Sequence, residues 1–406
     1  MQSTRRGIVR GFGFSSLLSL FPFARNAAAA RSTPPNVLKE LGIRPLLNFR
    51  GTHTVIGASK QWPELHEAMA EISRHFVPLG ELQDKVGARI AALMGTEDAY
   101  VTTGAAGAIT IGTCGCLTGE DTAKVRQLPD LTGMKSEVVI LKAHRNGYDH
   151  AVRNTGVKIV EPESREQFVN ALNANTAMVY FLGGHSGDWD SPQPLPIDEM
   201  MPITKKAGVP VMVDAANMLP PWENLRKLAA LGVDLICSSG GKHMRGPQCS
   251  GILAGRRDLV RAARLNSSPF SDSLGRPMKV GREEIVGAWL AAEKYSKLDF
   301  EAIDREYKAQ ADYLADQLRK IRGMRVSFAP HDKTRRVHRV VAEWDEKALG
   351  ISGDECEKLL LDGEPRVAVM RQKQAIMFTV FMNDPGDEKF AAKRMREIFS
   401  DAKKKA

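Results

Sequence analysis

Lys242 is the residue of this chain whose surroundings point most directly to chemistry. It follows an apolar stretch and lies in a glycine-rich turn between Ser239 and Gln248. A second apolar stretch, which starts at Val209, ends in the carboxylate of Asp214. An amine and a carboxylate that each follow an apolar strand are expected at one edge of a sheet, where both can reach the same ligand.

The pair formed by Lys242 and Asp214 suggests a particular cofactor. A lysine amine forms a Schiff base with an aldehyde, and a carboxylate keeps a pyridine nitrogen protonated so that the ring accepts electrons. Both are requirements of pyridoxal 5′-phosphate (PLP), so the sequence predicts a PLP site with these two catalytic residues. Taken singly, Lys242 would also suit a solvated loop, and Asp214 would suit a helix N-cap.

A phosphate site is predicted where a strand-like segment runs into Gly104, Ala105 and Ala106. Side chains without bulk let backbone N–H groups approach a phosphate, and the start of the following helix adds partial positive charge. A tight strand-to-helix turn would have the same composition. Ser239, just before the lysine turn, is placed to donate a second hydrogen bond to the phosphate.

His144 follows the strand-like segment 137–141. An imidazole at this place could lie flat against the cofactor ring and transfer protons, although a polar loop would look similar. The segment 182–188, which contains His185, ends another predicted strand and could line the substrate side or contact the O3′ atom of the cofactor.

Arg276 and Lys279 lie in a cationic loop before a predicted helix. Such a charge run is often only solvated, but here it could bind a substrate carboxylate or phosphate across a dimer interface. No metal site is expected, because the five cysteines have no metal-ligand or paired spacing and are predicted to be buried thiols.

A length of 406 residues predicts more than one domain. Continuous apolar runs recur at spacings that leave room for helices, which indicates an α/β fold with a mostly parallel sheet. A helix is expected at 63–75, one long helix over 287–321, and a small α+β domain after it. The predicted divisions are a signal peptide at 1–30, an arm with helices at 31–85, a PLP-binding large domain at 86–290 and a small C-terminal domain at 291–406. The predicted strands cover 98–103, 137–141, 157–160, 177–182, 209–214, 234–237, 251–254, 324–328, 336–343, 367–369 and 375–381.

The first thirty residues resemble a twin-arginine export signal, with Arg5-Arg6, a weakly apolar stretch and the small residues 27–30. Export to the periplasm is therefore expected. If this segment is only a basic N-terminus and not a signal, a cytoplasmic location is expected instead. The net charge of +9 falls to 9 − 4 = +5 without its four arginines. This balance gives little reason to expect tRNA or another nucleic acid as a partner, and no other segment is apolar enough to span a membrane.

Together, these motifs resemble the selenocysteine synthase-like branch of the fold-type I PLP-dependent enzymes, whose fold is similar to that of aspartate aminotransferase. That branch includes L-seryl-tRNA(Sec) selenium transferase and D-glucosaminate-6-phosphate ammonia-lyase. The resemblance runs from about residue 41 to the C-terminus. It is carried by Asn48–Thr52, Phe76–Gln83, Val101–Ala106, His144–His150, Val213–Ala216, Leu219–Asn224, Ser239–Gln248 and Gly275–Gly281.

The resemblance implies that Lys242 is the Schiff-base lysine, Asp214 the pyridinium partner and His144 the ring-stacking residue. It also implies a homodimer or larger homo-oligomer. The N-terminal helical module that the selenium transferase uses for tRNA is expected to be missing, and the motifs match the lyases more closely. We therefore expect a lyase that removes an α-proton and a β-substituent from a polar or anionic amino acid or amino sugar acid. A selenium transferase, an amino acid racemase and a PLP-binding protein without activity are the alternatives.

Overall fold

The computed structural model describes residues 36–184, 194–331 and 335–405. The chain divides into two units, residues 1–45 and 46–406. Among its described residues the first unit holds the short helix α1 (Val37–Glu40), whose start is capped by the side chain of Asn36. All other described elements belong to the second unit. Within the described ranges, no helix is both long enough and apolar enough to cross a membrane.

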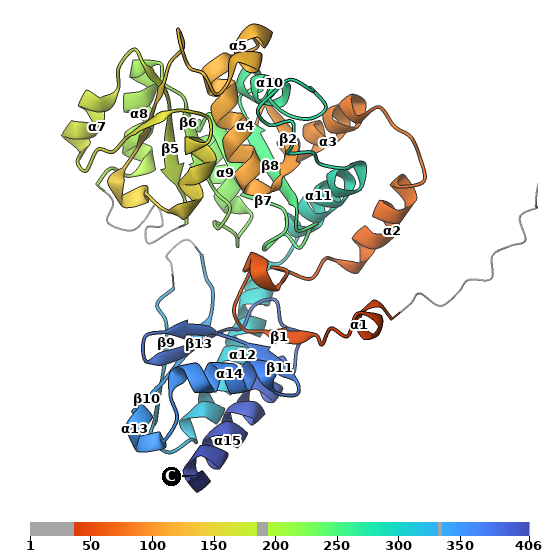
Figure 1. Cartoon of the computed structure of the whole chain (residues 1–406), viewed down its shortest axis with the longest axis vertical. Coiled ribbons are helices and arrows are strands. Elements are labelled where there is room, and N and C mark those ends of the chain that lie inside the picture. Colours follow the sequence, from red (N-terminus) through yellow and green to blue (C-terminus); the bar gives the residue numbers. More distant parts are fainter. Residues whose placement is uncertain (1–35, 185–193, 332–334, 406) are drawn as a thin grey trace, which may run out of the picture. The chain divides into compact units, whose positions relative to one another are not determined.

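A seven-stranded sheet forms the centre of the second unit (Figure 1), in the order β2-β8-β7-β6-β5-β3-β4. Only β8 runs antiparallel to its two neighbours, so the sheet is mostly parallel, as predicted. The strands are β2 (Asp98–Thr103), β3 (Glu137–Ile140), β4 (Lys158–Val160), β5 (Thr176–Leu182), β6 (Val211–Asp214), β7 (Leu235–Ser239) and β8 (Ser250–Gly255).

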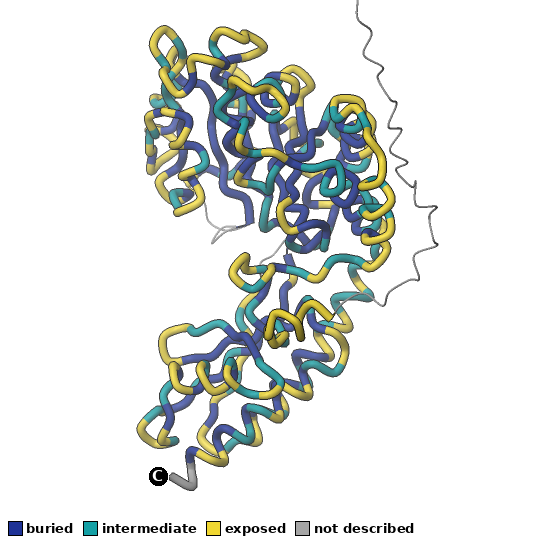
Figure 2. Tube along the Cα trace, turned by 45° about the vertical axis from the view of Figure 1, so that its right-hand side comes forward, coloured by how far each residue is buried: buried dark blue, intermediate teal, exposed yellow. Residues whose placement is uncertain are grey.

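Both faces of this sheet are buried, which explains why its strands read as continuous apolar runs. Along β5, for example, Val179 and Phe181 belong to one hydrophobic cluster, while Met178 and Tyr180 belong to the other. Figure 2 shows the central strands as buried and the outer helix surfaces as exposed. The first face is covered by α3 (Leu79–Met94), α7 (Arg165–Ala171), α8 (Ile197–Ala207), α9 (Glu223–Ala230) and α11 (Arg282–Tyr295), and the second by α4 (Gly104–Thr118), α6 (His150–Arg153) and α10 (Arg257–Leu265).

The C-terminal part has its own core around a four-stranded antiparallel sheet in the order β12-β13-β10-β9. A separate parallel pair joins β1 to β11, so a short strand near residue 46 is part of this region. The elements are β1 (Leu46–Asn48), β9 (Met324–Phe328), β10 (Arg339–Trp344), β11 (Arg366–Ala368), β12 (Met370–Gln372), β13 (Ala375–Thr379), α12 (Phe300–Arg319), α13 (Glu346–Leu349), α14 (Gly353–Asp362) and α15 (Asp387–Lys405).

The prediction of one long helix over 287–321 is wrong. Helix α11 ends at Tyr295, and α12 begins at Phe300. The side chain of Asp299 accepts a hydrogen bond from the backbone N–H of Ala302 at 2.9 Å, which caps the start of α12. An aspartate side chain satisfies a backbone donor that a continuous helix would bond internally, so it marks a new start. The helix predicted at 63–75 is α2 (Pro63–Ile72).

Candidate active site

The predicted catalytic residues gather at one edge of the seven-stranded sheet. Asp214 is the last residue of β6, Gly104 follows β2, and His144 closely follows β3. Because β8 returns antiparallel to β7, their connection turns at the carboxyl end of β7, and this connection carries Lys242. Parallel strands end on the same edge, so the topology brings the four residues to a shared edge where ligands bind in such sheets.

Lys242 is half-buried, and burial lowers the pKa of its amine. The negative charge of Asp214 opposes this shift, and the positive charge of Arg335 adds to it. These charges act on the amine because both groups lie near it. A lowered pKa leaves more of the amine neutral at physiological pH, as a nucleophilic lysine requires.

The lysine turn, residues 240–248, is held from outside by the segment that precedes α2. The Ser59 hydroxyl donates to the carbonyl of Gly241 at 2.8 Å. The Trp62 indole N–H donates to the carbonyl of Met244, also at 2.8 Å. These bonds fix the backbone on either side of Lys242, so the lysine is not on a free solvated loop.

Asp214 is buried, with only 6% of its surface exposed. The Tyr180 hydroxyl donates to its Oδ2 at 2.8 Å, and the backbone N–H of Ala216 donates to its Oδ1 at 3.0 Å. Asp214 is not a helix N-cap, since Trp222 occupies that place before α9. A carboxylate has about four acceptor sites, so each oxygen can still accept from a further group such as a pyridine N–H.

The predicted phosphate site lies at the start of helix α4. Gly104 has a φ of +69°, and Thr103 at the N-cap makes no side-chain capping bond. Ala105 is half-buried and Ala106 is exposed, so small side chains surround the first backbone N–H groups of the helix. An uncapped helix start with this surface suits a phosphate.

Strand parity places the other predicted groups on the side of the sheet that α4 covers. Met212 and Cys237 belong to the cluster beneath α4. Side chains alternate along a strand, so Asp214 and Ser239, two residues further along their strands, face the same side. Ser239 is buried at 9% exposure, beside the carboxylate end of β6. The donor set of amine, carboxylate, hydroxyl and helix start therefore fits PLP.

His144 is buried rather than displayed on a polar loop. Its ring meets the Phe181 ring edge-on, with centroids 4.4 Å apart, and its Nδ1 accepts a long 3.4 Å bond from the backbone N–H of Leu182. An accepting Nδ1 leaves the ring proton of a neutral imidazole on Nε2. Downstream, Asp149 receives bonds from the side chains of Arg145 and Arg153 and so anchors this loop. Ring stacking by His144 stays a prediction.

A cationic cavity beside the lysine turn was missed by the sequence interpretation. It has a volume of about 370 Å³, and its lining includes Arg50, Arg335 and Arg339. None of the described residues that line it is acidic. The Nε of Arg50 is buried and has no hydrogen-bond partner among the described residues. Arg335 is itself buried, and its guanidinium donates to the carbonyl of Asn217 at 2.7 Å.

Two histidines connect this cavity to Lys242. Burial lowers the pKa of His53, and the charges of Arg50 and Lys242 lower it further. The pKa of His243 is held well below its usual value by burial, then by Arg335 and Lys242. The His243 ring is stacked on Phe381, with centroids 4.4 Å apart. Because both histidines line the cavity and both respond to the charge of Lys242, the cavity adjoins the lysine.

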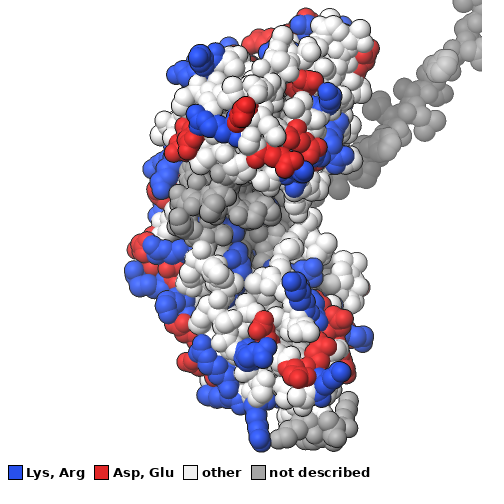
Figure 3. All heavy atoms as spheres, turned by 90° about the vertical axis from the view of Figure 1, so that its left-hand side faces the viewer, with Lys and Arg blue, Asp and Glu red and all other residues white. Residues whose placement is uncertain are grey.

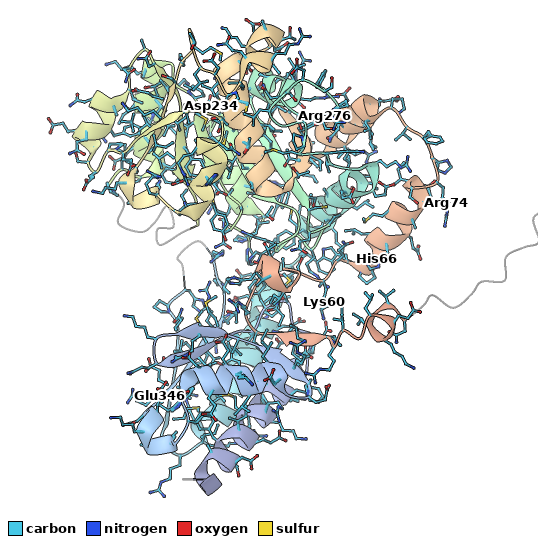
Figure 4. The ribbon with its side chains drawn as sticks, viewed as in Figure 1. Lys60, His66, Arg74, Asp234, Arg276 and Glu346 are labelled. Carbon is cyan, nitrogen blue, oxygen red and sulfur yellow. The ribbon has the colours of Figure 1, made fainter. Side chains whose placement is uncertain are left out.

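The structure does not bring Arg276 and Lys279 to this cavity. Arg276 is half-buried and donates to the Ser268 hydroxyl at 3.4 Å, and Lys279 is exposed. In Figure 4 Arg276 is labelled on the part of the second unit that holds the seven-stranded sheet, and Met278, two residues further along the chain, lies beside Gly107 in the first turn of α4. Their contact with a substrate, in the same subunit or across a dimer interface, stays a prediction. The 182–188 segment lies largely outside the described residues.

Sequence signals for the cavity existed, but they did not identify it. Arg50 lies in the motif 48–52, to which the sequence analysis gave no functional role. Arg339 is the first residue of β10, which was predicted as a strand but not as part of a binding site. Arg335 precedes that strand. Arg50 is far in sequence from Arg335 and Arg339, so the three arginines share one cavity only through the fold. Cys114, Cys237 and Cys356 are buried as predicted, whereas Cys116 is half-buried and Cys249 is exposed.

Comparison with known proteins identifies the family. The Aminotransferase class-V model matches residues 165–346. The 5′-C-glycyluridine monooxygenase-decarboxylase of a Streptomyces species is 30% identical over 81% of this chain and 82% of its own length. D-glucosaminate-6-phosphate ammonia lyase of Salmonella typhimurium is 29% identical over 91% of this chain and 99% of its own length. The chain belongs to the fold-type I PLP-dependent enzymes.

Two further comparisons refine this placement. A solved structure of D-glucosaminate-6-phosphate ammonia-lyase superposes with a TM-score of 0.78 at 28% identity, covering 91% of this chain and all of that one. L-seryl-tRNA(Sec) selenium transferase of Carboxydothermus hydrogenoformans is 25% identical over 63% of this chain and 57% of that enzyme. The predicted fold, branch and cofactor are thereby confirmed: this is a PLP-dependent enzyme of the selenocysteine synthase-like branch. When bound, PLP supplies an electron-accepting ring that stabilises negative charge on the substrate α-carbon.

Proposed function

We propose that this enzyme is a lyase that acts on an amino acid or amino sugar acid with an anionic group. It would remove the α-proton and a β-hydroxyl, so that water is lost across the Cα–Cβ bond. The product of this step is an enamine, which becomes an imine. Hydrolysis of the imine consumes one water molecule and releases ammonia and a 2-keto acid. The observation that carries the proposal is the cationic cavity beside Lys242, which has three arginines and no described acidic residue.

Each residue of the site has a separate role in the proposed reaction. Lys242 holds the cofactor and, once the substrate amine has replaced it, takes the α-proton, for which a neutral amine is needed. Asp214 holds the ring nitrogen protonated. Arg50, Arg335 and Arg339 bind the anionic group of the substrate, because planar guanidinium groups match carboxylate and phosphate oxygens.

Two observations favour a lyase over the alternatives. A lyase named for an anionic amino sugar acid matches nearly the whole chain, whereas the selenium transferase match covers 57% of that enzyme. On the face in Figure 3, Lys and Arg side chains of the described residues are interspersed with Asp and Glu, so this face offers tRNA no continuous basic surface. A racemase would share the α-proton step but would need no β-substituent.

A substrate panel tests the proposal. Purified enzyme with PLP is given D- and L-amino acids and amino sugar acids, each with and without a phosphate or second carboxylate and a β-hydroxyl. We expect equal yields of ammonia and 2-keto acid, only from anionic substrates with the β-hydroxyl. Solvent deuterium at the α-carbon with inversion and no ammonia would instead identify a racemase. Oxygen uptake with release of carbon dioxide would show the chemistry named for the Streptomyces relative.

We also propose that the enzyme is exported and works as a homodimer or larger homo-oligomer. The twin-arginine-like segment supports export, although residues 1–30 lie outside the described part of the chain. The fully exposed Phe76 and the 80% exposed Val55 are large apolar side chains that a second copy would cover. N-terminal sequencing should find a start near Arg31, and light scattering should give at least twice the chain mass; an intact Met1 in a cytosolic fraction, or a monomer, would contradict these proposals.

A further inference from the structure

Tyr180 is a fully buried residue of β5 whose hydroxyl has one described partner, the carboxylate of Asp214. In the paired register of β5 and β6, Tyr180 lies opposite Met212 and Leu182 lies opposite Asp214. Tyr180 thus lies two residues before the level of Asp214, and its side chain extends toward the carboxyl edge of the sheet. This places a phenol O–H directly beneath the group expected to hold the cofactor nitrogen.

A tyrosine is an unusual choice at this position. The rest of β5 beyond Thr176 is apolar, and the cluster around Tyr180 contains Met178 and Leu182. Phenylalanine would fill the same space without burying an O–H group, which costs free energy unless it is hydrogen-bonded. The hydroxyl is thus explained by its bond to Asp214 and not by packing.

We propose that Tyr180 is a positioning residue for Asp214, which fixes the direction of the carboxylate that is expected to hold the cofactor nitrogen. With Tyr180 on Oδ2 and Ala216 on Oδ1, each carboxylate oxygen has one fixed donor. Two fixed donors prevent rotation of the carboxylate about the Cβ–Cγ bond. The proposal rests on PLP as cofactor and not on the identity of the substrate.

The surroundings make Tyr180 a permanent donor. Burial raises the pKa of its phenol, and the charge of Asp214 raises it further, so the proton stays on the oxygen. Cys237, paired with Asp214 on the next strand, also has a pKa well above its usual value through burial and the same charge. Both neighbours are therefore neutral, and among the described residues Asp214 forms no ion pair. Neutral donors stabilise its charge without neutralising it.

The test is Tyr180→Phe, which removes only the hydroxyl. We expect the affinity of the apo-enzyme for PLP and the value of kcat each to fall about 10- to 100-fold, as the loss of a hydrogen bond to a charged group implies, with KM little changed. A loss of PLP affinity and kcat with an unchanged KM is a result that a purely structural role of Tyr180 would not give.

Tyr100→Phe is the matched control. Tyr100 belongs to the same hydrophobic cluster, and its hydroxyl donates to the carbonyl of Ser268 at 3.0 Å. Loss of the Tyr100 hydroxyl should lower the melting temperature modestly but leave PLP affinity and kcat unchanged. If Tyr180→Phe behaves like this control, Tyr180 only fills space and the proposal is overturned.

A double-mutant cycle with Asp214→Asn gives a second measurement. PLP affinity is measured by titration of apo-enzyme without substrate, so failure of the proposed lyase activity would not affect it. If Tyr180 acts through Asp214, Tyr180→Phe should change PLP affinity little in the Asp214→Asn background. Additive losses would show that the two residues act independently and would also overturn the proposal.

Discussion

Replacement of Arg50 by methionine is expected to separate substrate binding from stability. The Arg50 guanidinium lines the cationic cavity, and its Nε is buried without a hydrogen-bond partner among the described residues. A buried donor without a partner costs about 1–3 kcal/mol of stability. Methionine keeps an unbranched side chain but removes the donor and the charge, so the free energy of unfolding should stay equal or rise.

The same change should weaken binding of an anionic substrate. A hydrogen bond from a guanidinium to a carboxylate or phosphate contributes about 1.5–3 kcal/mol, so the apparent Michaelis constant should rise about 10- to 100-fold. PLP affinity should change little, because Arg50 is not among the groups that fit the cofactor. Steady-state kinetics on the substrate found by the panel, PLP titration and thermal unfolding measure the three effects separately.

Arg165→Met is the matched control, because Arg165 is exposed on α7 and pairs with Glu199 away from the cavity. It should leave the Michaelis constant unchanged. If Arg50→Met lowers stability by more than about 1 kcal/mol while the Michaelis constant stays the same, Arg50 is a structural residue and the reasoning about the cavity fails.

Three further predictions follow from the site. Asp214→Ala should still bind PLP but lose turnover by orders of magnitude, since an unprotonated ring stabilises a carbanion poorly; near-normal turnover would show that another group protonates the ring. Arg276→Ala should raise the Michaelis constant for an anionic substrate about 10- to 100-fold with PLP retained; loss of PLP on dialysis with unchanged substrate dependence would place Arg276 in the cofactor site. Burial lowers the pKa of His243 in the folded state, so below about pH 6.5 the unfolded chain binds more protons and stability falls with acidification, by up to about 1.4 kcal/mol per pH unit. His243→Gln should flatten this slope in thermal unfolding, and exposed His66→Gln is the control.

Much of the large sheet could be predicted from sequence because the relevant signals are local. Val138, Val139 and Ile140 alternate between two buried faces, so the strand is a continuous apolar run that needs no partner to be recognised. The same holds for β6 and β7. Asp214 is the last residue of β6, and Lys242 lies in the connection that follows β7. Because the two strands are parallel, both residues lie at the carboxyl edge of the sheet.

The features that could not be predicted depend on contacts between distant residues. Nothing local shows that the Tyr180 hydroxyl reaches Asp214 or that Arg50 shares a cavity with Arg335. The break before α12 was missed for a different reason. Apolar spacing continues across it, and only the capping side chain of Asp299 marks the new start.

The central claim, that Lys242 holds PLP at this edge of the sheet, is tested most directly by borohydride reduction of the PLP-loaded enzyme. Reduction should fix the cofactor to one residue, and proteolysis with mass spectrometry should find the added mass on the peptide that contains Lys242. Lys242→Ala should fold, as judged by circular dichroism, and give neither a reduced adduct nor the absorbance of the Schiff base. An adduct on another lysine of the wild-type enzyme, or an unchanged adduct in the variant, would contradict this account.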